Sequence, residues 1–170
     1  MGRTIFVTGG ARSGKSDYAL EQAEPAAGSK VFIATAEPAD AEMLERVNAH
    51  RRQRANGWKT IEEPVNLAKA LADAANAEVV IVDCLTLWVT NMLCREIAPE
   101  PMFDALVCEL KRERSGTLYI VSNEIGMGIV PDNALSRRFR DLAGKLNRMT
   151  AHAADEAVLV VSGIPLTIKR

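Results

Sequence analysis

The chain carries the segment Gly9-Gly10-Ala11-Arg12-Ser13-Gly14-Lys15-Ser16 between a short apolar run at 4–8 and a helix-like run at 17–23. The segment has the form G-x-x-x-x-G-K-[ST]. Glycines let the backbone curl so that successive N–H groups point at phosphate oxygens, and the helix that follows adds its positive amino-terminal end. Lys15 is expected to reach the β- and γ-phosphates, and the Ser16 hydroxyl to bind Mg²⁺. A Gly-rich turn that only connects strand to helix is the simpler alternative, but motif and context together predict a phosphate-binding loop (P-loop) for a nucleoside triphosphate.

The composition is that of a globular protein. The 170 residues are 48% hydrophobic and 25% charged, with a formal net charge of −1, so we expect one domain over residues 1–170 and no nucleic-acid partner. Cys84, Cys94 and Cys108 share no C-x-x-C spacing. A disulfide framework or a zinc site is therefore not expected, and a cytoplasmic location fits. No apolar run approaches the length of a membrane span.

Hydrophobic periodicity predicts alternating strands and helices. Strands are expected at 4–8, 31–35, 58–62, 79–83, 117–122 and 158–162, and helices at 15–24, 41–55, 66–75, 84–93, 102–114 and 132–153. This alternation predicts an α/β fold with a mostly parallel sheet. A last short strand at 164–168 follows Gly163 and is expected to pair antiparallel at the edge, because Pro165 suits an edge position. The buried stripe of the last helix is expected at Leu135, Phe139, Leu142, Leu146 and Met149.

The predicted helix at 41–55 carries Arg46, His50 and Arg54 at four-residue spacing, so the three side chains share one face. The simpler interpretation is a solvated basic surface. The flanking cations, however, favour a neutral imidazole at His50, and a neutral imidazole beside cations can attack a phosphate. The residues alone leave both interpretations open.

Asp83 ends the apolar, β-branched run Val79-Val80-Ile81-Val82. In a P-loop protein such a carboxylate binds Mg²⁺ directly or through water. The alternative is an ordinary strand followed by a helix that Asp83 caps. On the helix that follows, Thr86, Thr90 and Asn91 are polar groups that either face the site or form local hydrogen bonds.

The segment Asn123–Pro131 follows the predicted strand at 117–122. Because α/β proteins bind ligands at the carboxyl ends of parallel strands, this loop is expected to line the site. A plain connector is the alternative, although the loop is apolar and contains Glu124, whereas solvent-exposed connectors are usually polar. His152, near the end of the last helix, fits a helix-terminal position better than a catalytic one.

With these segments in place, the chain resembles, over nearly its whole length, the bifunctional adenosylcobinamide kinase / adenosylcobinamide-phosphate guanylyltransferase family of cobalamin biosynthesis. The Asn-Glu-x-Gly-x-Gly-x-x-Pro loop and the Glu-Met…His helix are its most specific features. The stretches that carry the resemblance are Val7–Ser16, Ile33–Ala36 with Asp40–Met43 and His50, Trp58–Glu62, Asp83–Thr86 with Thr90 and Asn91, and Ser122–Pro131 continuing to Arg138–Asp141.

The resemblance implies two reactions. Adenosylcobinamide takes the γ-phosphoryl group of ATP or GTP, and GTP then guanylylates a histidine, which passes GMP to adenosylcobinamide phosphate to give adenosylcobinamide-GDP. It also implies a three-layer, RecA-like P-loop fold, a homotrimer, and Mg²⁺ at Ser16 and Asp83. The histidine falls at His50. The implied nucleotide contacts are Gly9, Gly10, Ala11, Arg12, Ser13, Gly14, Lys15 and Ser16 for phosphates, with Ala34, Thr35, Ala36, Arg51, Arg52, Gln53, Arg54, Glu62 and Asp83 around the guanine nucleotide.

Two other functions remain as alternatives. The chain would be a P-loop kinase of a small molecule if His50 were only a basic surface residue. It would be a GTP-binding regulatory module if it bound GTP with almost no turnover and used Asn123–Pro131 as a switch. Protein-bound nucleotide separates the first from a guanylyltransferase, and turnover with a corrinoid acceptor separates the second.

Overall fold

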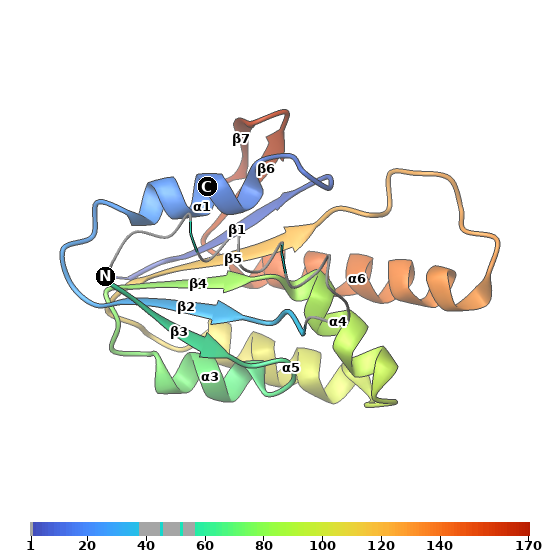
Figure 1. Cartoon of the computed structure of the whole chain (residues 1–170), viewed down its shortest axis with the longest axis horizontal. Coiled ribbons are helices and arrows are strands. Elements are labelled where there is room, and N and C mark those ends of the chain that lie inside the picture. Colours follow the sequence, from blue (N-terminus) through green and yellow to red (C-terminus); the bar gives the residue numbers. More distant parts are fainter. Residues whose placement is uncertain (1, 38–44, 46–51, 53–56) are drawn as a thin grey trace.

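The computed structural model describes residues 2–37, 45, 52 and 57–170, so most of the predicted helix at 41–55 lies outside the described residues. The strands are β1 (Thr4–Gly9), β2 (Lys30–Ala34), β3 (Trp58–Glu62), β4 (Val79–Asp83), β5 (Thr117–Asn123), β6 (Glu156–Val161) and β7 (Ile164–Lys169). The helices are α1 (Lys15–Ala23), α3 (Leu67–Asp73), α4 (Leu85–Cys94), α5 (Pro99–Leu110) and α6 (Ala134–Ala153) (Figure 1).

The described strands form one seven-stranded sheet in the order β3-β2-β4-β5-β1-β6-β7. Strands β1 to β6 pair in parallel, and β7 pairs antiparallel to β6 at the edge. The predicted parallel sheet and the antiparallel edge strand that contains Pro165 are therefore confirmed. Although β1 and β2 follow one another along the chain, β5 and β4 lie between them in the sheet.

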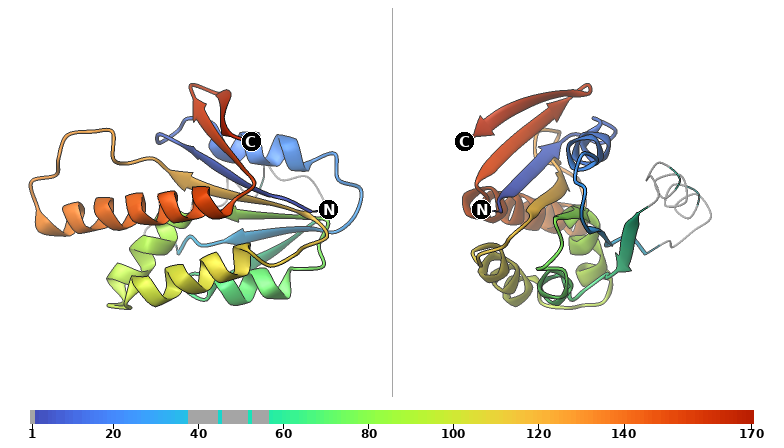
Figure 2. Two further views of the ribbon diagram at one scale, coloured as in Figure 1. Left: turned by 180° about the vertical axis from the view of Figure 1, so that it is seen from behind. Right: turned by 90° about the vertical axis from the view of Figure 1, so that its left-hand side faces the viewer.

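Helices cover both faces of the sheet, so the chain has the predicted three layers (Figure 2). Successive residues of β4 show why. Val79 and Ile81 pack in the core on the α1 side with Ala19, whereas Val80 and Val82 pack in the larger core beneath α3 to α6. Both faces of the central strands are apolar because side chains alternate across a strand and each face must be buried.

Two expectations from the sequence were wrong in detail. The helix expected at 102–114 is α5, which begins at Pro99 and ends at Leu110. A proline is tolerated in the first helical turn, where its missing N–H has no partner to lose. Leu135, expected in the buried stripe of α6, is 65% exposed, whereas Leu142 and Leu146 are buried as expected. The first turns of α6 extend past the ends of the strands and have no sheet to pack against (Figure 1).

The end of α6 is held by a contact that the sequence did not suggest. The Lys169 ammonium of β7 donates hydrogen bonds to the carbonyl oxygens of Ala151 and His152, each at 3.0 Å, and to that of Ala154. This cation neutralises the negative end of the longest helix and ties the edge strand to it. Among the helices of the described ranges, none combines the length and apolar character of a membrane span.

Candidate nucleotide site

Because the strands are parallel and in register, predicted site residues on several of them lie together at the edge of the sheet formed by the carboxyl ends of the strands. Gly9 lies opposite Asn123, and Ala34 lies between Glu62 on one neighbouring strand and Asp83 on the other. These residues are 21 to 114 positions apart in sequence, and they meet because each ends a parallel strand. Ligands of open α/β sheets bind at this edge.

The P-loop backbone departs from ordinary strand and helix geometry at several residues. Gly9 has a φ of 151°, Arg12 a φ of 57°, and Gly14, the N-cap of α1, a φ of 91°. The Ser13 N–H donates to the Gly10 carbonyl at 3.3 Å, which closes the turn. Left-handed residues within such a turn direct successive N–H groups to one side, where they can bind an anion.

The hairpin between β6 and β7 supports this loop from behind. The Gly163 N–H donates to the Ser13 carbonyl at 2.8 Å, and a Cβ added at Gly9 would lie 2.2 Å from the Val160 carbonyl oxygen. Sequence reasoning did not anticipate this support, because the hairpin lies about 150 residues away along the chain.

Gly9→Ala is expected to lower the free energy of unfolding by more than about 2 kcal/mol, because the new methyl group would overlap the backbone of β6. Gly10→Ala is the matched control. A Cβ at Gly10 meets nothing within 4 Å, so its stability should change by less than about 0.5 kcal/mol. Denaturant titration measures both, and equal midpoints for the two variants would contradict the clash.

Lys15, in the first turn of α1, is turned into the loop. Its side chain is 6% exposed, and its ammonium donates to the Gly10 carbonyl at 2.6 Å and to the Ser13 hydroxyl at 3.3 Å. Burial lowers the pKa of Lys15 below the usual value of a lysine, while the nearby Cys84 and Asp83 act in the opposite direction. A buried cation enclosed by main-chain groups has little solvation to lose when an anion arrives.

Asp83 lies close enough to Lys15 to influence its titration. The capping alternative requires Asp83 to be the N-cap of α4. The N-cap is Cys84, so Asp83 lies one residue before it. Burial raises the pKa of the Cys84 thiol to about 12, and the Asp83 carboxylate adds to this shift. The thiol is therefore neutral at physiological pH and is unsuited to be a nucleophile or a metal ligand.

Thr35 is fully buried, and its hydroxyl is used for structure. The hydroxyl oxygen accepts a hydrogen bond from the Cys84 N–H at 2.9 Å and donates one to the Cys84 carbonyl at 2.7 Å. The Thr35 main chain is bonded as well: its N–H donates to the Asp83 carbonyl at 3.2 Å, and its carbonyl accepts from the Asn91 amide at 2.7 Å. On either side, Ala34 and Ala36 are half-buried, while Glu62 is exposed at the end of β3.

A buried hydrogen-bond network beneath β5 is a feature that sequence reasoning missed. The Asn147 amide of α6 accepts from the Ser122 hydroxyl at 2.6 Å and donates to the Asn123 carbonyl at 3.0 Å. The Thr86 hydroxyl accepts from the Asn123 N–H at 2.8 Å. This network holds the end of β5 opposite Gly9. An asparagine among the buried residues of an amphipathic helix was the signal that could have revealed it.

The loop after β5 begins at the P-loop, because the Glu124 N–H donates to the Gly9 carbonyl at 2.9 Å. The Glu124 carboxylate accepts from the Gly126 N–H at 2.5 Å, within its own loop. Further along, Met127 and Ile129 are 83% and 97% exposed. The loop therefore presents an apolar surface next to the candidate site, unlike a polar connector.

Part of the predicted site has no structural description. His50, Arg51, Gln53 and Arg54 lie outside the described residues, whereas Arg52 is described and exposed. Within the described ranges, no group of three or more His, Cys, Asp or Glu side chains could hold a metal ion.

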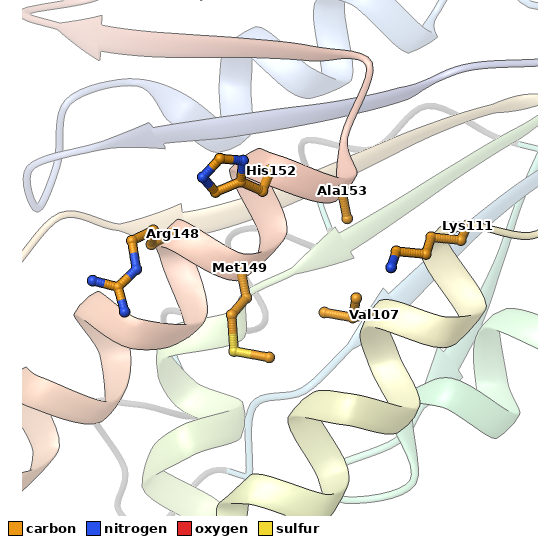
Figure 3. Close-up of a pocket in the computed structure, with 6 residues that line it drawn as sticks. All are labelled: Val107, Lys111, Arg148, Met149, His152 and Ala153. Atoms are coloured by element: carbon orange, nitrogen blue, oxygen red, sulfur yellow. The ribbon is translucent and has the colours of Figure 1, made fainter.

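A separate cavity of about 340 Å³ lies between the last turns of α5 and α6. Figure 3 shows Met149 pointing from α6 toward Val107 on α5, with Lys111 and His152 at the rim. The ends of these two helices lead into the starts of β5 and β6. The cavity therefore lies at the amino ends of the parallel strands, whereas the P-loop lies at their carboxyl ends, and His152 is remote from the candidate site.

The chain is similar to one known family over nearly its whole length. A family model described as cobinamide kinase / cobinamide phosphate guanyltransferase matches residues 5–168. The bifunctional adenosylcobalamin biosynthesis protein CobP of Pseudomonas aeruginosa is 40% identical over 166 residues, which are 96% of this chain and 96% of the relative. The bifunctional adenosylcobalamin biosynthesis protein CobU of Escherichia coli K12 is 39% identical and is covered over 99% of its length, with 97% of this chain.

Solved structures with similar folds are far more distant in sequence. A type III secretion ATPase has a TM-score of 0.59 at 13% identity, and the match covers 98% of this chain and 57% of that one. A KaiC-like protein from Pyrococcus horikoshii has a TM-score of 0.52 at 16% identity, with 92% of this chain and 71% of that one. At these identities the likeness concerns the fold alone, which is that of the P-loop ATPases.

Proposed function

Because the chain belongs to the cobinamide kinase / cobinamide phosphate guanyltransferase family, we propose that its two transferase activities follow one another at the P-loop edge of the sheet, the second through a guanylyl group on His50. The chain is a bifunctional enzyme of adenosylcobalamin biosynthesis, with kinase and guanylyltransferase activity. The proposal concerns how these residues carry out the reactions.

In the kinase step, the hydroxyl oxygen of the aminopropanol arm of adenosylcobinamide bonds to the γ-phosphorus of ATP or GTP. The bond to the β-phosphate oxygen breaks, and the nucleoside diphosphate leaves. In the guanylyl step, an imidazole nitrogen of His50 bonds to the α-phosphorus of GTP and pyrophosphate leaves. A phosphate oxygen of adenosylcobinamide phosphate then takes the guanylyl group, which gives adenosylcobinamide-GDP and frees His50. A covalent intermediate divides one difficult displacement into two easier ones.

The observation that carries the proposal is the buried Lys15 ammonium, which the Gly10 carbonyl and the Ser13 hydroxyl hold inside the P-loop. The loop amides and Lys15 would bind the phosphate chain and neutralise the charge that develops on the leaving group, because both reactions displace a phosphate oxygen. Ala34, Ala36 and Glu62 would contact the guanine nucleotide at the neighbouring strand ends, and the buried Thr35 would hold the backbone between the two alanines. Arg51, Arg52, Gln53 and Arg54 would complete those contacts.

Mg²⁺ fits the donors at this edge. The half-buried Ser16 hydroxyl and the half-buried Asp83 carboxylate are oxygen ligands of the kind that Mg²⁺ prefers, and a nucleotide-bound Mg²⁺ needs only one or two protein ligands. We propose that Ser16 and Asp83 hold it. The ion would supply positive charge to the phosphate oxygens.

Asp83→Asn is expected to raise the Mg²⁺ concentration for half-maximal GTP binding about tenfold or more, because the anionic ligand is lost. Titration of nucleotide binding against Mg²⁺ measures this shift. An unchanged Mg²⁺ curve would indicate that Asp83 has only a structural role at the start of α4.

We further propose a homotrimer, active in the cytoplasm where ATP and GTP are available. Two exposed apolar surfaces support an assembly: Met127 and Ile129 on the loop after β5, and Ile164 and Leu166 on β7. Exposed apolar patches of this kind mark interaction surfaces, and two different patches on one chain can join head to tail into a closed ring. Light scattering should give three times the chain mass of 18.5 kDa, and the mass of a monomer would refute the trimer.

The test of the proposed function is incubation of the protein with Mg²⁺ and GTP labelled at the α-phosphate, followed by addition of adenosylcobinamide phosphate. We expect label on the protein that is labile in acid and stable in base, as a phosphoramidate is, and its transfer to the corrinoid. Corrinoid phosphorylation without protein label would support a simple kinase. Bound GTP with no turnover would support the regulatory module.

A further inference from the structure

Asn91 of α4 joins two segments of the candidate site. It is 8% exposed. Its amide nitrogen donates to the Thr35 carbonyl at 2.7 Å and to the Pro64 carbonyl at 3.0 Å. A primary amide has two N–H donors, so both are used on main-chain oxygens from two different loops, one after β2 and one after β3.

The two loops carry the ends of neighbouring strands. Thr35 directly follows Ala34, and Pro64 follows Glu62 by two residues, while Ala34 and Glu62 are paired in the sheet. Within the loops, the Glu63 N–H donates to the Ala34 carbonyl at 2.9 Å. Beyond that bond, the Asn91 amide links the main chains of the two loops through Thr35 and Pro64.

Two other side chains of α4, those of Trp88 and Thr90, each donate a hydrogen bond to one segment. The Trp88 indole N–H donates to the Val65 carbonyl at 2.7 Å and therefore holds only the loop after β3. The Thr90 hydroxyl donates to the Thr86 carbonyl at 3.1 Å, within the helix itself. Asn91 thus differs from its neighbours in setting the position of one loop relative to the other.

We propose that Asn91 is a positioning residue for the guanine nucleotide, and this inference rests on the proposed function of the site. Its amide keeps Ala34–Ala36 and Glu62 in register with Asp83 and so with the P-loop. Binding groups must be held within a fraction of an ångström of their productive positions, and buried amide contacts to main-chain oxygens provide this rigidity. Sequence reasoning left Asn91 between a site-facing role and local hydrogen bonding, and the structure assigns it to neither.

The test compares Asn91→Leu with two variants of the same helix. Leucine has a similar volume and no donor, so both carbonyls lose their partner. Thr90→Val removes a hydrogen bond that stays within α4. Val89→Ala removes core methyl groups from a residue that is 0% exposed, and so lowers stability without removing a side-chain hydrogen bond to either loop. GTP affinity, the KM for GTP in guanylyl transfer, and the thermal midpoint are measured for each variant.

We expect Asn91→Leu to raise the dissociation constant and the KM for GTP about tenfold, with a smaller effect on the turnover of bound GTP. Thr90→Val and Val89→Ala should keep the affinity of the parent protein at temperatures below their midpoints. An Asn91→Leu affinity within twofold of the parent, or equal losses in Asn91→Leu and Val89→Ala, would overturn the inference. If Asn91→Leu does not fold, Asn91→Ser, which has no donor long enough to span both loops, is held to the same criteria.

The two proposals fail separately. Absence of protein label and of guanylylated corrinoid in the parent protein counts against the proposed function. The role of Asn91 is decided by equilibrium binding of GTP, which needs no turnover. A parent protein that binds GTP, and an Asn91→Leu variant that binds it equally well, would reject the positioning role even if both reactions were present.

Discussion

Lys15→Ala should lower both the corrinoid kinase and the guanylyltransferase activity by about 10²–10³-fold. Lys15 is the buried cation of the P-loop. Its ammonium donates to the Gly10 carbonyl and the Ser13 hydroxyl at the N-terminus of α1. Without the Lys15 ammonium, no lysine of the P-loop neutralises the negative charge that develops on the phosphate chain in either transition state. Initial rates of both reactions at saturating nucleotide measure the effect.

Lys69→Ala is the control for this prediction. Lys69 is an exposed lysine of α3 whose ammonium pairs with Asp73 at 2.6 Å on the helix surface, so both activities should be retained. The Lys15 variant itself should fold, because burial lowers the pKa of this lysine and its removal relieves that cost. Full activity of a folded Lys15→Ala protein would reject the P-loop as the site of both reactions.

The second large effect concerns His50. His50→Ala should abolish the labelling of the protein by α-labelled GTP, because the nitrogen that would carry the guanylyl group is absent. Phosphorylation of adenosylcobinamide should be largely spared, since that step uses the γ-phosphate and needs no histidine. The two readouts, protein label and corrinoid phosphate, are measured on the same preparation.

The chain offers a matched control, because it contains only one other histidine. His152 lies at the end of α6, beside the cavity between α5 and α6 and at the far edge of the sheet. His152→Ala should label like the parent protein. Label that survives in His50→Ala, or disappears in His152→Ala instead, would remove His50 as the nucleophile.

Much of the fold was predictable from the sequence. The strands expected at 4–8, 58–62 and 79–83 agree with β1, β3 and β4 within one residue. In β1 and β4, runs rich in apolar, β-branched residues suit strands that are buried on both faces. The largest boundary error concerns α5, which starts three residues before and ends four residues before the helix expected at 102–114. Its first turn tolerates Pro99. Leu135 has the spacing of the stripe, but its turn extends past the sheet.

Some residues of the candidate site were likewise predictable from the sequence, and others were not. Motif chemistry located Lys15, Ser16 and Asp83, and the structure brings Lys15 and Asp83 close together. The position of Ala34 between Glu62 and Asp83 could not be derived from sequence order, because β3 and β4 are consecutive strands in the chain and yet lie on opposite sides of β2. His50 remains a prediction from resemblance.

The sequence alone therefore determines the P-loop, since its conformation depends on eight consecutive residues whose glycines and helix start act locally. The tertiary structure decides what surrounds that loop. Val160 and Gly163 behind it, Asn147 beneath β5 and Asn91 between two loops are all partners distant in the chain. Such contacts depend on strand order and register, which arise from packing of the whole sheet, and no local pattern of residues specifies them.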